Sequence, residues 1–125
     1  MLAALNQRRD ESGCPALVVD ERLQRAAQAH ADDLYSREAI DHVGGDGATL
    51  EQRLERVGYP FLRRSEVISR AHGVDALPVV DQWLDEPPDG PHRSSILNCD
   101  YADTGIGWRE TPDHIAYWVV DLGQQ

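Results

Sequence analysis

The sequence predicts an α+β fold. Amphipathic helical patterns dominate the first part of the chain, and two strand-like segments separated by a short turn end it. Helices that precede an antiparallel hairpin favour packed α and β layers over a parallel βαβ arrangement. With 125 residues, 41% of them apolar, the chain suits one globular unit. We therefore expect a single domain over residues 1–125.

Helical spacing is clearest near the start of the chain. A first helix is expected over Leu2 to Arg9, ending near Gly13. A second follows Asp20, a residue type favoured at helix N-caps. Its apolar stripe has helical spacing: Leu23, Ala26, Ala27, His30, Ala31 and Leu34. Since His30 lies within that stripe, we expect it to be a core histidine with satisfied hydrogen bonds.

The middle of the chain alternates irregular and regular segments. The glycine-rich stretch from Asp41 to Ala48 predicts a loop. Thr49 is expected to cap a third helix that ends at Gly58. A short strand is then expected over Ser65 to Ser69. A further helix is expected over Leu77 to Leu84, with a proline in its first turn, where proline is tolerated.

The last third of the chain predicts a loop and a hairpin. Three prolines and a glycine indicate a loop from Asp85 to Arg93. Strands over Gly105 to Trp108 and Ile115 to Leu122, joined by a turn at residues 111–113, predict an antiparallel hairpin. All three tryptophans are expected in the core, as aromatic residues in helices and strands usually are: Trp83, Trp108 and Trp118.

Charge and hydropathy exclude several classes of partner. The net charge is -10, and all 12 basic residues are arginines. An acidic chain does not suit nucleic acid, whose phosphates require a basic face, or an anionic membrane surface. No apolar run approaches the roughly 20 residues that span a bilayer. We therefore expect no nucleic-acid partner and no transmembrane segment. We also expect a monomer.

Two histidine segments are the most informative feature for function. One is Asp41-His42-Val43-Gly44, and the other is Pro91-His92-Arg93. Glu66 lies between them in an apolar run. Two imidazoles and a carboxylate suggest a shared site that holds a divalent metal or moves a proton. His72 and His114 adjoin turn residues and are expected on the surface.

The two cysteines leave two interpretations open. Cys14 and Cys99 both adjoin turn-forming residues, and neither belongs to a C-x-x-C pair. A structural zinc site or a thioredoxin-like motif is therefore not predicted. Their positions are compatible with a disulfide joining the two ends of the domain, and equally with two reduced cysteines.

Short motifs follow one another along nearly the whole chain. In order they are Leu5-Asn6 with Arg9, Leu17…Asp20…Leu23…Ala26…His30-Ala31, His42 with Gly44 and Asp46-Gly47, Gly58-Tyr59, Glu66-Val67-Ile68, Trp83, His92-Arg93-x-x-Ile96-Leu97-Asn98, Tyr101, Gly105-Ile106-Gly107 and Tyr117-Trp118-Val119-Val120-Asp121. This series resembles the CAP superfamily of cysteine-rich secretory proteins, antigen 5 and pathogenesis-related 1 proteins. The similarity is greatest to its short bacterial members, the SCP-like extracellular domains.

The resemblance implies an α-β-α sandwich with a central antiparallel sheet and a cleft. His42 and His92 match the two cleft histidines of the family, and Glu66 matches its first acidic residue. A second acidic residue would follow the helix that ends near residue 84, where Asp85 or Glu86 is the candidate. Some family members hold zinc or another divalent ion at these positions.

The resemblance also implies a location outside the cell and a disulfide bond. Bacterial members are usually secreted or anchored at the cell surface, and disulfides form in oxidising compartments. The family comparison therefore favours a Cys14–Cys99 disulfide. Arg93 would lie at the cleft rim, where it is expected to brace the loop by pairing with a carboxylate.

The chain departs from the family beside the site residues. The four departures are Asp41, Val67, Pro91 and Ser95. Such neighbours orient imidazoles through hydrogen bonds and tune metal affinity by roughly 10–100-fold. A weaker metal site, or one that serves only structure, is the expected consequence.

Three functions fit these observations. The first is a secreted or cell-surface binding module for an envelope component, a lipid or a protein, with a divalent ion, zinc foremost, on His42, His92 and Glu66. The second is a metal-dependent hydrolase of the cell envelope with Glu66 as base. The third is a structural or adhesion domain without metal. We expect a binding protein rather than a classical enzyme. No G-x-S-x-G elbow surrounds Ser94 and Ser95, so a serine hydrolase is not predicted.

Overall fold

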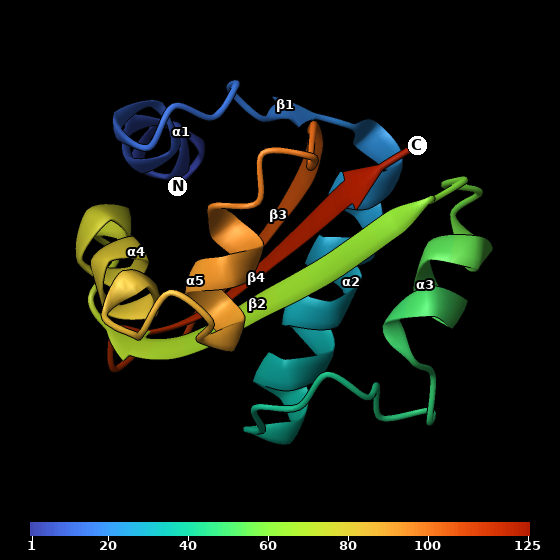
Figure 1. Cartoon of the computed structure of the whole chain (residues 1–125). Coiled ribbons are helices and arrows are strands. Elements are labelled where there is room, and N and C mark those ends of the chain that lie inside the picture. Colours follow the sequence, from blue (N-terminus) through green and yellow to red (C-terminus); the bar gives the residue numbers. More distant parts are fainter.

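The computed structural model describes residues 1–125 and contains five helices and four strands (Figure 1). In chain order these are α1 (Leu2–Glu11), β1 (Val18–Val19), α2 (Glu21–Arg37), α3 (Leu50–Arg56), β2 (Arg63–His72), α4 (Ala76–Leu84), α5 (Pro91–Ile96), β3 (Asp103–Glu110) and β4 (Ile115–Gln124). No helix combines the length and the apolar character needed to cross a membrane.

The four strands form one sheet in the order β1-β3-β4-β2. Strand β4 pairs antiparallel with β3 on one side and with β2 on the other. The predicted hairpin and the antiparallel centre of the sheet are therefore confirmed. Strand β1 adds a two-residue parallel pairing to β3, which the sequence did not predict because so short a strand has no periodicity.

Helices cover both faces of the sheet. On one face, Trp118, Val120 and Leu122 of β4 belong to a core that includes residues of α1, α4 and α5. On the other face, Tyr117 and Val119 pack with α2. Because successive strand residues point to opposite faces, the apolar run of β4 supplies both cores. This gives the predicted α-β-α sandwich, with α2 behind the sheet in Figure 1 and α4 and α5 in front.

Helix α2 lies directly on the backbone of β3. A Cβ atom at Gly105 would lie 2.1 Å from the carbonyl of Leu23, and one at Gly107 would lie 2.1 Å from the carbonyl oxygen of Ala27. Neither position can carry a side chain without moving the helix. The glycine pattern of β3 therefore sets the spacing between α2 and the sheet.

Three predictions needed correction. Helix α5 begins at Pro91, inside the predicted loop, because proline suits the first helical position. Strand β2 extends well beyond Ser65 to Ser69, since its polar end residues still pair with β4. Trp108 is not in the core, because 40% of it is exposed. Trp83 and Trp118 are buried as predicted.

Arg9 joins the two ends of the domain. It is fully buried and forms no ion pair; its guanidinium donates to the backbone carbonyls of Pro15, Ile96, Asn98 and Tyr101. Burial lowers the pKa of Arg9 from its usual value. The five N–H donors of a guanidinium suit such a ring of carbonyl oxygens.

The Cys14–Cys99 disulfide closes the same junction. It confirms the pairing that the family comparison favoured. The two cysteines are 85 positions apart, and a cross-link over a loop of this length stabilises a fold by about 4 kcal/mol in a chain-entropy model.

Replacing Arg9 is expected to destabilise the domain strongly. Arg9→Met leaves several buried carbonyls without a donor, so we expect the free energy of unfolding to fall by about 3 kcal/mol or more. Arg9→Lys keeps the charge but not the planar fork, and should recover only part of this loss. Urea unfolding measures both. Arg63→Met, at an exposed ion pair with Asp100, is the control; equal losses at both positions would contradict the assignment.

Candidate functional site

Glu66 is the centre of a buried charge network. It lies on β2 directly opposite Asp121 of β4, on the face covered by α2 and α3. Its side chain is 1% exposed, and both carboxylate oxygens accept hydrogen bonds from Arg53. The Nη1–Oε2 distance is 2.8 Å and the Nη2–Oε1 distance is 2.9 Å. This two-pronged geometry is the strongest form of an arginine–carboxylate pair.

The same network holds the glycine-rich loop. His42 Nδ1 lies 3.0 Å from Glu66 Oε1, and Arg53 Nη2 also donates to the His42 carbonyl oxygen at 2.8 Å. The hydrogen bond to Glu66 raises the pKa of His42 above its usual value, and partial burial opposes this. The outer part of the ring reaches solvent, since 56% of the side chain is exposed.

Two further ionisable groups adjoin Glu66. His30 Nε2 donates to the Asp41 carbonyl oxygen at 2.7 Å and lies 3.8 Å from Glu66 Oε1. Burial lowers the pKa of His30, so its ring is neutral. Burial, reinforced by the charge of Glu66, raises the pKa of Asp121 well above its usual range. This environment favours the neutral form of Asp121 beside the ionised Glu66.

The environment of Glu66 keeps it ionised. Burial alone would raise the pKa of Glu66, but the interactions with His42, Asp121 and Arg53 outweigh it and lower the pKa to about 2. The Glu66 carboxylate is thus a permanent anion at any physiological pH. His30 is in the core as predicted, although only one of its two ring nitrogens is hydrogen-bonded.

His92 has a separate carboxylate partner. At the start of α5, His92 Nδ1 lies 2.7 Å from Glu86 Oε2. Glu86 Oε1 accepts the backbone N–H groups of His92 and Arg93 at 2.9 and 3.0 Å, so Glu86 caps this helix. The hydrogen bond to His92 is the main reason that the pKa of Glu86 is lowered. A side chain at Gly90 would collide with Glu86, since its Cβ would lie 2.5 Å from the Glu86 Cβ.

Asp85 and Arg93, which were also expected beside the site, make different contacts. Asp85 is exposed and makes no side-chain hydrogen bond or ion pair, so Glu86 rather than Asp85 is the acidic residue that contacts His92. Arg93 Nη1 donates to the backbone carbonyl of Glu86 at 3.0 Å. Arg93 therefore braces the loop as expected, although through a carbonyl rather than a carboxylate. The remaining histidines, His72 and His114, are exposed as predicted.

Both histidine segments are attached to β2, the edge strand of the sheet. Glu66 holds the His42 loop on one face. Its neighbour Ser65 contacts Ser95 of α5 on the opposite face, with the two Oγ atoms 2.7 Å apart. His92 lies one helical turn before Ser95. Adjacent residues of one strand thus anchor the two segments.

The predicted metal ligands do not form a three-residue group. No set of three or more His, Cys, Asp or Glu side chains is arranged to hold a metal ion. Glu66 is also a poor third ligand by chemistry, because Arg53 binds both of its oxygens. The structure instead gives two imidazole–carboxylate pairs, His42 with Glu66 and His92 with Glu86.

Sequence reasoning missed two members of the network. Arg53 lies beside Leu54 on the apolar side of α3, three residues after Leu50, and this position signals burial. Asp121 ends a run of strongly apolar β4 residues, where an acid is unexpected. Neither signal identifies Glu66 as their common partner, because that pairing depends on strand register.

Comparison with known proteins shows which family has this architecture. The family described as "Cysteine-rich secretory protein family" (CAP) matches residues 2–122. The "Uncharacterized protein YkwD" of Bacillus subtilis (strain 168) is 26% identical over 106 residues, which cover 85% of this chain and 40% of that protein. The chain therefore spans well under half the length of this curated relative.

Two solved structures are similar over almost the entire chain. An outer surface protein from Borrelia burgdorferi has a TM-score of 0.85 and 25% identity, covering 99% of this chain and 89% of its own. An extracellular protein containing a SCP domain from Bacillus anthracis str. Ames has a TM-score of 0.81 and 23% identity, covering 97% of this chain and 38% of its own. Together with the match over residues 2–122, the sandwich and its ordered motifs establish that this chain belongs to the CAP family.

Proposed function

We propose that the chain is an extracellular binding module of the CAP family. In this proposal, His42 and His92 supply the binding groups, which contact a ligand directly or through a divalent ion. The disulfide supports an oxidising location. The similar proteins from Borrelia burgdorferi and Bacillus anthracis are described as an outer surface protein and an extracellular protein, which agrees with that location.

One observation carries the proposal. In both His42 and His92, Nδ1 is held by a carboxylate, while Nε2 makes no hydrogen bond to the protein. A carboxylate on Nδ1 fixes the tautomer and leaves the Nε2 lone pair free to bind, the arrangement found around metal-ligating histidines. Both rings also reach solvent, with 56% and 37% of their side chains exposed.

This arrangement changes the role that we assign to Glu66. In the proposed metal site, the two imidazoles would be the protein ligands and waters would complete the coordination. Glu66 and Glu86 would orient the rings. A bound zinc ion would act as a Lewis acid toward an oxygen or nitrogen of the ligand.

Hydrolysis is the less favoured function. A general base is most effective when its pKa lies near the working pH. The pKa of Glu66 is about 2, and Arg53 and His42 already bind its oxygens. Glu66 is therefore a poor base, and no other acid in the network reaches solvent, because Asp121 is fully buried.

A zinc titration tests the proposed binding groups. We expect calorimetry at about pH 7.5 to detect zinc binding by the wild type and none by His42→Ala/His92→Ala. Affinity should fall as the pH is lowered, because protons compete for imidazole and the pKa of His42 is raised.

The matched control changes two histidines outside these pairs. His72→Ala/His114→Asn is suitable, since asparagine tolerates the positive φ of 64° at His114. Binding should be unchanged in this variant. Absence of zinc binding by folded wild type would reject the metal and favour a structural or adhesion role.

Glu66→Gln tests whether Glu66 stabilises the fold as an anion. The change leaves the Arg53 charge buried without a counter-ion, so we expect a loss of about 3 kcal/mol in unfolding free energy at neutral pH. The pKa of Glu66 is about 2 in the folded state and about 4.3 when unfolded. Its stabilisation is therefore complete above about pH 5 and is lost as the pH falls toward 2.

Urea unfolding over this pH window measures the difference between variant and wild type. The difference should shrink as the pH is lowered. Glu51→Gln, at an exposed ion pair with Arg64, serves as the control and should change stability little. A difference that stays constant with pH would argue against an ionised Glu66.

A further inference from the structure

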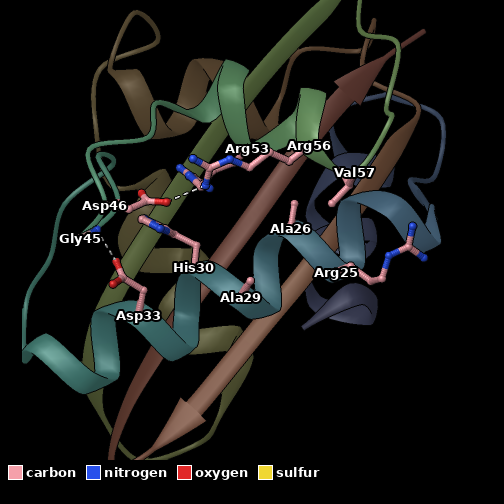
Figure 2. A pocket seen from close by; sticks show the side chains of 11 residues that line it. Arg25, Ala26, Ala29, His30, Asp33, Gly45, Asp46, Arg53, Arg56 and Val57 are labelled. Atoms are coloured by element: carbon pink, nitrogen blue, oxygen red, sulfur yellow. Dashed lines mark hydrogen bonds and ion pairs between the residues drawn. The ribbon is translucent and has the colours of Figure 1, made fainter.

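A second candidate site lies between α2, α3 and the loop that contains Gly44 and Gly45. The pocket has a volume of about 320 Å³, within the range of roughly 300–1,000 Å³ that is usual for small-ligand sites. Figure 2 shows Arg25 at one end, and Asp46, Arg53 and His30 toward the other. Neither His42 nor His92 lines it, so it is separate from the imidazole groups proposed above, and either proposal can fail alone.

Two residues that line the pocket each have a buried polar atom without a partner. His30 is 1% exposed, and its Nδ1 makes no hydrogen bond. Because Nε2 donates to the Asp41 carbonyl, Nδ1 of the neutral ring is an acceptor. Arg53 is 8% exposed, and its Nε–H is a donor without a partner. Buried polar groups are normally satisfied. An unmatched acceptor and an unmatched donor on two residues that line one pocket therefore point to a ligand.

The chemistry of these two atoms restricts that ligand. A carboxylate accepts hydrogen bonds but cannot donate one to His30. A hydroxyl can accept from the Arg53 Nε–H and donate to the His30 Nδ1. The inner end of the pocket therefore suits a hydroxyl-bearing molecule.

The charges of the lining add a second requirement. Three arginines and two aspartates line the pocket, in a protein whose net charge is -10. Arg53 pairs with Glu66, and Arg56 pairs with Asp46. Arg25 is exposed and has no hydrogen bond or ion pair, so its charge is available to a ligand. Ala26, Ala29 and Val57 supply a small apolar wall.

We propose that this pocket binds a small anion that carries several hydroxyl groups, of the uronic acid class. A sugar hydroxyl bridges His30 and Arg53 at the inner end. The carboxylate lies toward Arg25, and a face of the sugar ring lies on the alanine and valine side chains. In this assignment the ligand contacts the unpartnered His30 Nδ1 and Arg53 Nε–H. It also lies near Arg25, the one arginine of the lining without an ion pair.

Side-chain NMR gives a direct test with glucuronate, glucose and acetate as probes. Spectra of the arginine Nε–H groups and the histidine ring nitrogens should show saturable shifts at Arg53 and His30 with glucuronate. Glucose should cause the same shifts with weaker binding, and acetate should not shift His30. Two results would overturn the proposal: acetate alone causing the same saturable shifts at Arg53 and His30, or glucuronate causing no saturable shift. A pocket that holds only water would give no saturable shift with glucuronate.

Variants test the position of the site. Arg25→Gln should weaken glucuronate binding about threefold to fivefold, which is the effect of losing one exposed ion pair, and leave glucose binding unchanged. Arg63→Gln is the charge-matched control. Ala29→Leu should abolish binding by filling the pocket, whereas Ala3→Leu, on the exposed side of α1, should not. Binding that survives Ala29→Leu with the same shifts would place the ligand elsewhere and overturn the assignment.

Discussion

The two-pronged bond between Arg53 and Glu66 is the constraint on which the arrangement of the candidate site depends. It connects α3 to the edge strand β2, and through the His42 carbonyl it also holds the glycine-rich loop. His30 of α2 adjoins the same carboxylate. A buried ion pair is weak evidence for net stability, since apolar residues of similar volume often stabilise as well. Its importance here is positional, because three segments distant in sequence share one anion.

The Arg53–Glu66 bond also bears on whether Glu66 is a metal ligand or a residue that orients His42. A sequence pattern cannot distinguish these two roles. A glutamate near two histidines is an apparent metal ligand until its oxygens are located. With Arg53 on both oxygens, Glu66 can orient His42 but has little capacity left for a cation. Glu86 stands in the same relation to His92 and also caps α5. Each imidazole therefore has its own carboxylate.

Local signals predicted much of the fold. Asp20 and Thr49 cap their helices as expected, the latter with a full capping box. The apolar residues of the last strand and the turn at residues 111–113 identified the hairpin. Two features set by distant partners were not predictable, the parallel pairing of Val18 and Val19 and the exposure of Trp108. The start of α5 at Pro91 was missed although proline at the first helical position is a local signal.

The candidate site, like the fold, could be predicted from the sequence only in part. His42, His92 and Glu66 could be named as candidates from sequence, because their residue types and the family resemblance indicate chemistry. Their partners could not be assigned, since Arg53 and Asp121 meet Glu66 only through helix packing and strand register. The unpartnered nitrogen of His30 was equally invisible, because an apolar stripe indicates burial and not the direction of each ring atom.

The two glycines of β3 have a consequence for evolution and engineering. Helix α2 carries His30 and one wall of the pocket, and it rests on Gly105 and Gly107 where no Cβ fits. Any larger residue at either position would shift α2 and alter the 3.8 Å separation between His30 and Glu66. Mutational tolerance at these positions should therefore depend on the shape of the pocket as well as on folding. Libraries that aim to reshape the pocket should vary its lining and keep both glycines fixed.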